Sequence, residues 1–175
     1  MDTTEPMATE SLAALIDHIK ITHHQYVRAQ IARFTPIFDK ICAKHGAEHP
    51  ELDQMRTVFA GLSAELTSHL MKEEVMLFPY IERLEEAVIE KSPVIPPPFG
   101  TVKNPVRMMM YEHDGAAEAL RELRRLSNGY EPFADACGGL KTLYTSLTEF
   151  EADLHQHIHL ENDILFPRAI ALESA

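Results

Sequence analysis

The sequence contains one chemically suggestive pattern twice. It reads HLMKEEVMLFP from His69 to Pro79 and HIHLENDILFP from His157 to Pro167. In each copy a glutamate follows the histidine by four residues, and Leu-Phe-Pro begins four residues after the glutamate. Residues four apart on a helix share a face, so each copy presents an imidazole and a carboxylate together. Two such pairs facing one another would form a metal site, most simply a site for two metals.

Two further histidines extend the pattern. His24 lies 45 residues before His69, and His113 lies 44 residues before His157. Each half of the chain therefore contains one histidine, a long interval, and then His-x-x-x-Glu with Leu-Phe-Pro. Either a gene duplication or a shared geometric requirement would produce such a repeat, and both explanations stay open.

Four helical segments are needed to position these residues. Apolar residues recur at helical spacing over about 9–45, 50–89, 104–128 and 131–172. Pro36 is expected to kink the first helix, and the two Leu-Phe-Pro prolines to bend or end the second and fourth. Residues 92–101 are too proline-rich for a helix and form an extended crossover between two helical hairpins. We therefore predict an all-α, antiparallel up-down-up-down four-helix bundle over residues 12–172, with a disordered tail over 1–11 and a linker over 91–104.

The candidate ligands lie within the apolar stripes of these helices. On the fourth helix the stripe is Leu147, Phe150, Leu154, His157, Glu161 and Leu165, and on the second it is Leu62, Leu66, His69, Glu73 and Leu77. The first helix gives Ile21, His24, Val27, Ile31 and Phe34, and the third gives Val106, Met110, His113, Ala117 and Leu120. A buried carboxylate is costly unless it is paired or bound to a metal. One histidine in each buried stripe, with a glutamate in two of them, therefore predicts a ligand cage in the bundle core.

The remaining histidines offer alternatives. His155, His159 and Asp163 form a rival strip at spacing four, but they lie on the opposite face of the fourth helix from His157. His23 adjoins His24 and competes with it for the same role. His45 is 21 residues from His24, roughly 30 Å along a continuous helix, which is too far to share one site.

Mixed imidazole and carboxylate ligands suit iron, manganese and zinc. Six ligands exceed the four of a single zinc site, so two metals with two bridging glutamates fit better. We expect the metals to be iron, because such sites commonly handle dioxygen, nitric oxide or peroxide. The coordination positions left open on the two iron ions would take an oxo or hydroxo bridge, or a small molecule.

Composition excludes several other classes. The chain has 175 residues, 45% of them hydrophobic, and a formal net charge of −11, which argues against nucleic acid and anionic membrane surfaces as partners. No segment is apolar and long enough to span a bilayer, and no signal peptide is recognised at the N-terminus. The two cysteines, Cys42 and Cys137, are far apart and are expected to be buried free thiols, which favours the reducing cytoplasm.

In these residues the chain resembles the hemerythrin-like bundle of the repair-of-iron-centres proteins. The resemblance extends from about Leu12 to Arg168 and rests on the two repeated motifs with His24 and His113. It implies a non-haem di-iron centre, with Glu73 and Glu161 bridging, and a role in restoring iron–sulfur clusters damaged by nitric oxide or oxidants. The implied metal ligands are His24, His69, Glu73, His113, His157 and Glu161.

Two differences qualify this resemblance. Oxygen-carrying hemerythrins have a second histidine where this chain has Ala117, and a His-x-x-x-x-Asp where it has His157 and Glu161 at spacing four. The resemblance is therefore to the repair proteins rather than to the oxygen carriers. Repair proteins also usually have a small cysteine-containing N-terminal domain, whereas about 11 residues precede the first helix here, so a partner would supply that part.

Three functional hypotheses follow. The first is a di-iron protein that supplies iron for cluster repair, or performs nitric oxide chemistry, under nitrosative or oxidative stress. Its partners would be nitric oxide or dioxygen and apo or damaged iron–sulfur proteins, with neither nucleic acid nor membrane. The second is a sensor of dioxygen, nitric oxide or iron, and the third is a di-iron oxidase or peroxidase.

Overall fold

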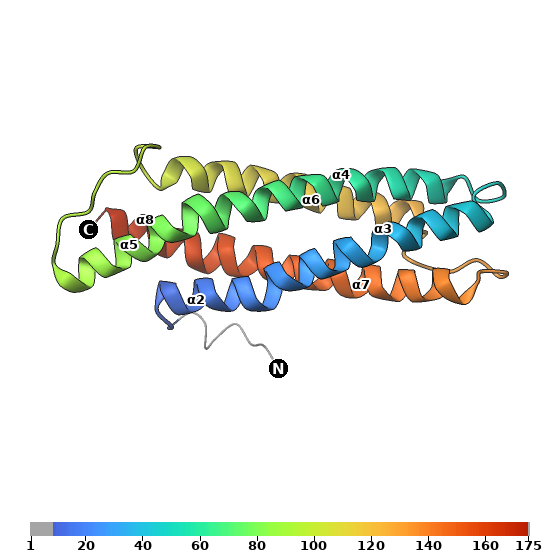
Figure 1. Cartoon of the computed structure of the whole chain (residues 1–175), viewed down its shortest axis with the longest axis horizontal. Helices are drawn as coiled ribbons and strands as arrows, with labels where there is room; N and C mark the ends of the chain where they lie inside the picture. The colour runs from blue at the N-terminus through green and yellow to red at the C-terminus, as the bar shows by residue number, and fades with distance from the viewer. Residues whose placement is uncertain (1–8, 175) are drawn as a thin grey trace.

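A computed structural model describes residues 9–174, which form four long helical rods (Figure 1). Three of the rods contain a short π-helical segment, labelled η. In chain order the rods are α2 (Leu12–Ile19), η1 (Lys20–His24) and α3 (Gln25–His45); α4 (Glu51–Lys72), η2 (Glu73–Leu77) and α5 (Phe78–Glu90); α6 (Lys103–Leu126); and α7 (Gly138–His159), η3 (Leu160–Leu165) and α8 (Phe166–Glu173). Successive rods run in opposite directions along the long axis (Figure 1). The predicted all-α, up-down-up-down bundle is confirmed.

The first rod begins with a side-chain cap. Ser11 has extended backbone geometry, and its hydroxyl accepts a hydrogen bond from the backbone N–H of Ala14 at 3.1 Å. The carboxylate of Glu85 accepts from the backbone N–H groups of Leu12 and Ala13, at 2.6 and 2.9 Å. These bonds satisfy donors that the first turn of a helix leaves open. The expected disordered tail falls mainly on residues 1–8, which lie outside the described residues.

The fourth rod begins later than the sequence pattern predicts. Residues 131–137 form turns and irregular backbone, and α7 starts at Gly138. Tyr130 stands directly before this stretch with φ at 64°, so the chain turns sharply after α6 instead of re-entering a helix. Its hydroxyl donates to the buried carboxylate of Glu151 on α7 at 3.0 Å, which attaches this connection to the bundle.

The π-helical segments coincide with the candidate ligands. In each segment the helix widens by one residue, so that the N–H of the following residue bonds five residues back. Phe78 donates to Glu73 in this way, and Phe166 donates to Glu161. Wide turns of this kind occur often at functional sites. Two of them, η2 and η3, end two residues before Pro79 and Pro167, where the missing N–H and the ring would otherwise disturb a regular turn. Neither proline ends its rod, and α3 likewise continues through Pro36.

Two of the expected buried stripes are partly wrong. Ile21 is 64% exposed, because η1 changes the helical phase and turns His23 and His24 inward together. On α6 the buried methionine is Met109, while Met110 is 43% exposed. The apolar triplet of methionines gave no basis for choosing between these registers.

Two hydrophobic clusters fill the bundle, one on each side of the ligand layer. The larger lies toward the α3–α4 turn and includes Phe34, Phe59 and Phe150. The smaller lies toward the α5 and α8 end and includes Ile16 and Phe166. Apolar packing on both sides holds the four rods at fixed separations around the intervening polar layer.

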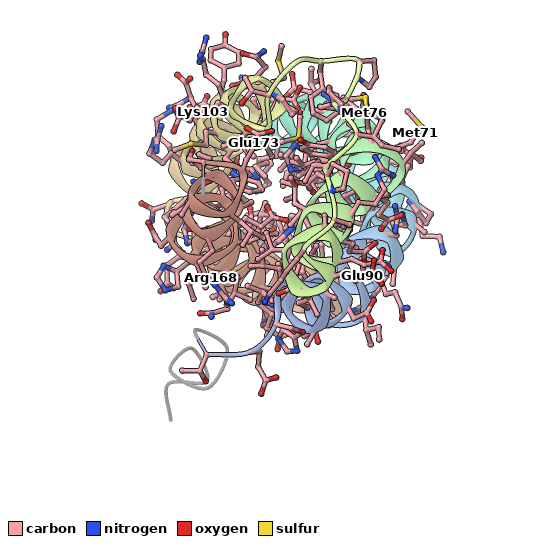
Figure 2. The ribbon with its side chains drawn as sticks, turned by 90° about the vertical axis from the view of Figure 1, so that its left-hand side faces the viewer. Met71, Met76, Glu90, Lys103, Arg168 and Glu173 are labelled. Carbon is pink, nitrogen blue, oxygen red and sulfur yellow. The ribbon has the colours of Figure 1, made fainter. Side chains whose placement is uncertain are left out.

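The proline-rich crossover between α5 and α6 is fastened to the last helix. Glu173 accepts hydrogen bonds from the hydroxyl of Tyr80 at 2.7 Å and from the backbone N–H of Val102 at 2.9 Å, and it also accepts from Thr101. Figure 2, which looks onto this end of the bundle, shows Glu173 beneath the crossover. Within residues 9–174, no helix is long and apolar enough to cross a membrane.

Candidate metal centre

All six side chains predicted as ligands meet in the middle of the bundle. His24 comes from η1, His69 and Glu73 from the α4–η2 junction, His113 from α6, and His157 and Glu161 from the α7–η3 junction. Each of them is at most 3% exposed. Every rod thus contributes one imidazole, and the second and fourth contribute one carboxylate each.

The six side chains divide into two overlapping groups of four. One group is His24, His157, Glu73 and Glu161; the other is His69, His113, Glu73 and Glu161. In each group the candidate ligand atoms lie within 4.8 Å of one another. Both carboxylates belong to both groups, which is the arrangement that bridging carboxylates require. We refer to the two groups as the 24/157 position and the 69/113 position.

The imidazoles converge through their Nε2 atoms. These atoms are 3.1 Å apart between His24 and His157, and 3.0 Å apart between His69 and His113. The Nε2 of His157 lies 3.0 Å from Glu161 Oε1, and the Nε2 of His113 lies 3.1 Å from Glu161 Oε2. Glu73 Oε2 is 3.4 Å from the Nε2 of His69 and 3.5 Å from that of His24.

Three of the four imidazoles are oriented by an acceptor at Nδ1. His24 Nδ1 lies 2.8 Å from Glu74, His69 Nδ1 lies 2.9 Å from Glu112, and His113 Nδ1 lies 2.9 Å from Asn162. Carboxylate and amide oxygens accept, so these Nδ1 atoms carry protons and the Nε2 lone pairs point into the centre. Metal-ligating histidines are commonly held in this way.

These three acceptors are not evident from helical spacing, although the repeat contains a signal for two of them. Glu74 directly follows Glu73, and Asn162 directly follows Glu161, so they occupy equivalent places in the two motifs. Each accepts from the histidine contributed by the other rod of its own hairpin. Glu112 has no such repeated counterpart, since the residue equivalent to it in the first half is His23.

The aromatic residue of each Leu-Phe-Pro has a similar duplicated role. Phe78 stacks on His24, with ring centroids 5.6 Å apart, and Phe166 stacks on His113 at 6.2 Å. The motif therefore supplies a ligand carboxylate, an acceptor and an aromatic wall from one short segment. The wide turns η2 and η3 allow all three to face inward.

The donor set requires a cation or additional protons. With Nδ1 protonated, the Nε2 atoms of His69 and His113 are both acceptors, yet they lie in hydrogen-bond contact. Among the described residues, neither oxygen of Glu73 nor Oε2 of Glu161 has a hydrogen-bond partner, and all three atoms are buried. Buried acceptors without donors are costly, and a pair of divalent cations would satisfy them. The residues present therefore fit a two-metal centre.

Comparison with known proteins agrees with this geometry. The family model described as the hemerythrin HHE cation binding domain matches residues 14–169. The chain belongs to the hemerythrin HHE family. Such a domain binds metal cations, as the description of the family states and as the His/Glu groups here allow.

Several curated relatives are iron–sulfur cluster repair proteins. A probable iron–sulfur cluster repair protein of Haemophilus influenzae is 36% identical over 160 residues, which are 91% of this chain and 66% of the relative. YtfE of Citrobacter koseri is 34% identical, covering 94% of this chain and 69% of its own. DnrN of Neisseria gonorrhoeae is 33% identical, and the match covers 90% of both chains. The hemerythrin domain described here thus spans about two thirds of the first two relatives.

Burial and charge divide protons unevenly between the carboxylates of this hemerythrin domain. Burial and the nearby charge of Glu161 raise the pKa of Glu73 well above its usual value. Burial acts in the same direction on Glu161, but the close imidazoles of His157 and His113 favour its charged form and hold its pKa well below the usual value. A proton in the metal-free pair therefore resides on Glu73.

The imidazoles respond to the same environment. Burial lowers the pKa of His69 to about 4. Burial also lowers the pKa of His157. For His113 the effect of burial is exceeded by hydrogen bonding and charge from Glu161, so its pKa is raised. Neutral imidazoles are the metal-binding form, so His69 and His157 are ready to bind at neutral pH.

The other candidate histidines of the hemerythrin domain lie apart from the two groups. His155, His159 and Asp163 are exposed on the outer face of the fourth rod. His45 is buried at the far end of α3, where its ring contacts Phe133 with centroids 5.4 Å apart.

His23 is buried beside the centre without joining either group. Its Nδ1 lies 3.0 Å from Asp153, and its ring stacks on that of His157 at 5.5 Å and 4°. His157 is the one ligand candidate whose Nδ1 has no hydrogen-bond partner among the described residues. Asp153, which contacts His23 through Oδ1, has its other carboxylate oxygen buried and without a hydrogen-bond partner among the described residues.

Proposed function

We propose that this protein holds a carboxylate-bridged pair of iron ions and supplies iron for the repair of damaged iron–sulfur clusters under nitrosative or oxidative stress. His24, His69, His113 and His157 would each bind one metal, and Glu73 and Glu161 would bridge both. The observation that supports this most strongly is the shared membership of both glutamates in the two four-residue groups. Similarity to the repair proteins supports the biological role.

The types of ligand determine which metal the centre would bind and what chemistry that metal would supply. Four imidazole nitrogens and two carboxylates form a mixed donor set that suits iron, as it also suits manganese and zinc. Bound iron would supply a redox-active, Lewis-acidic pair able to bind nitric oxide or dioxygen. Glu74, Glu112 and Asn162 orient three of the imidazoles, and the phenyl rings of the motifs limit water.

The ligand types also favour reversible holding. No cysteine is among the six, whereas thiolates are the ligands that hold iron in clusters. Among residues 9–174, Cys42 and Cys137 are free and belong to the packing near the α3–α4 turn, away from the ligand layer. Iron in a His/Glu cage would therefore pass readily to a thiolate-rich acceptor.

The test measures metal content first and transfer second. Protein from iron-replete cells should contain two irons per chain with the Mössbauer signature of a coupled pair. Incubation with an apo iron–sulfur protein, after treatment with nitric oxide or peroxide, should then move iron to the acceptor. One metal or none per chain would refute the di-iron centre. Two retained irons without transfer would favour a sensor, and catalytic consumption of dioxygen or peroxide would favour an oxidase.

A matched pair of variants links this test to the site. Glu161→Ala should abolish binding of the iron pair, because it removes a ligand from both positions. His155→Ala, on the exposed face of the same rod, should leave the content at the parental value. Retention of two tightly bound irons by Glu161→Ala would place the centre elsewhere.

A further inference from the structure

The two halves of the cage are related by a nearly constant sequence offset. It is 89 residues between the first and third rods, from His24 to His113, and 88 between the second and fourth, from His69 to His157. Residues next to the ligands of one metal position therefore have sequence counterparts next to the ligands of the other. Comparison of these counterparts shows where the two positions differ.

The 69/113 position faces a cavity with both of its imidazoles. A cavity of about 720 Å³ is lined by residues of α4, α6 and α7. His69 and His113 form part of its wall, and so does His157, but His24 does not. The 69/113 position is therefore accessible from this cavity, whereas the 24/157 position presents one imidazole to it.

The two halves of the chain differ in sequence at a position that lines this cavity. Gly115 lines the cavity, and its counterpart 89 residues earlier is Tyr26. The Tyr26 ring packs against the core and stacks on Phe150 with centroids 6.5 Å apart. At Gly115 a Cβ atom would meet nothing within 4 Å, so space filled by an aromatic ring on one side is left open on the other.

The residues next to the ligands also make the 69/113 position more open than the 24/157 position. Glu112 lines the cavity and holds His69 Nδ1, with Lys72 bonded to its other oxygen. Its counterpart is His23, which is 4% exposed and lies flat against His157. His23 is in turn fixed by Asp153. One metal position is thus covered by a stacked imidazole, and the other by a carboxylate at the edge of a cavity.

The charges around the cavity suit the passage of a cation. Besides Glu112, exposed carboxylates of Glu65, Asp114 and Glu118 line it, against the basic side chains of Lys72 and Arg121. Four carboxylates facing two cationic groups give a net negative lining. A concave surface of that sign raises the local concentration of cations.

From these differences we propose that the metal at the 69/113 position exchanges through this cavity and leaves first, while the metal at the 24/157 position is retained. The proposal rests on the proposed function, and it names the iron that is available for donation. The retained metal would hold Glu73 and Glu161 in place for reloading. The chain would thus donate one iron per cycle rather than two.

Removal of iron by a chelator tests the proposal. The Fe(II)-loaded protein, kept anaerobic, is mixed with excess ferrozine, and the iron released is followed by absorbance. Two phases of equal amplitude are expected. Crystals of half-stripped protein should show anomalous scattering from iron between His24 and His157, and none between His69 and His113. Release in one phase, or iron remaining at the 69/113 position, would overturn the proposal.

Substitution at Gly115 tests the route itself. Gly115→Tyr copies the residue of the closed side and should slow the first phase by about tenfold, which corresponds to an added opening cost of ~1.4 kcal/mol. The matched control is Gly61→Tyr on α4, where a Cβ also meets nothing within 4 Å and which does not line the cavity. Gly115→Leu is a second filling variant of smaller size. Unchanged first-phase rates in both filling variants would refute the route.

The outcome is separable from that of the proposed function. If the parent protein contains no iron pair, the proposed function fails. If it contains two irons and delivers them to an acceptor in a single phase, the proposed function stands and the inequivalence of the two positions is wrong. Circular dichroism and total iron content establish that each variant is folded and loaded before its release rate is compared.

Discussion

The acceptor at His69 offers a quantitative test of how the surrounding residues control metal affinity. Glu112 Oε2 lies 2.9 Å from His69 Nδ1, and the other oxygen is bonded to Lys72. The chain provides an internal comparison, because His113 has a neutral acceptor, Asn162, at the same distance of 2.9 Å. Glu112→Gln would give His69 the same kind of neutral acceptor.

The size of the effect follows from what each variant removes. Glu112→Gln keeps an acceptor oxygen and loses only the charge, whereas Glu112→Ala removes the hydrogen bond as well. Hydrogen bonds to charged groups contribute about 1.5–3 kcal/mol, and loss of such an acceptor usually lowers metal affinity about 10–100-fold. We therefore expect about a tenfold loss for Glu112→Gln and a loss approaching 100-fold for Glu112→Ala, confined to one of the two metals.

The assay is anaerobic titration of Fe(II) into apo-protein in competition with a chelator of known affinity. Glu149→Gln is the matched control, since Glu149 is an exposed glutamate on α7 that does not line the cavity. It should titrate like the parent. If both Glu112 variants bind two irons within twofold of the parental affinity, the hydrogen bond to His69 does not control the metal, and the argument from the surrounding acceptors is incorrect.

Two further predictions concern protons and stability. Because the pKa of Glu73 is raised well above its usual value, metal binding should displace the proton that Glu73 holds in the metal-free pair. Glu73→Gln should lower the release by about one proton per metal pair bound, measured with a pH indicator in weak buffer alongside the metal content. Equal release per bound pair in both proteins would contradict the assignment of that proton. Tyr130→Phe should lower the free energy of unfolding by about 1.5–3 kcal/mol in urea titrations, because it removes the buried hydrogen bond to Glu151. The control is Tyr111→Phe at an exposed tyrosine, which should change the free energy of unfolding by less than about 0.5 kcal/mol. Equal effects of the two tyrosine variants would show that the bond contributes nothing net.

Much of this molecule is determined by the sequence alone. The repeated His-x-x-x-Glu motifs and the apolar spacing predict an antiparallel bundle, and they single out six side chains that the structure then brings together. The physical reason is that a helix converts spacing into direction, and that six polar residues in apolar stripes are tolerated only if they share a partner. The family resemblance rests on the same residues.

Other features required the tertiary structure. The wide turns η1, η2 and η3 change the helical phase within a single turn, so no fixed period predicts that Ile21 faces outward while His23 faces inward. The late start of α7 goes with the bend at Tyr130, which is stabilised by a hydrogen bond to Glu151, 21 residues further along the chain. In both cases the local sequence pattern predicts a regular helix, and the packed structure departs from it.

The difference between the two metal positions is also a tertiary property. Sequence alone presents two equivalent halves, because the ligands themselves repeat. Only the packing reveals that Tyr26 fills on one side the space that Gly115 leaves open on the other, and that His23 covers His157 while Glu112 borders a cavity beside His69. A spacing rule specifies which atoms can reach a metal, whereas access to that metal depends on the volume that neighbouring helices leave unfilled.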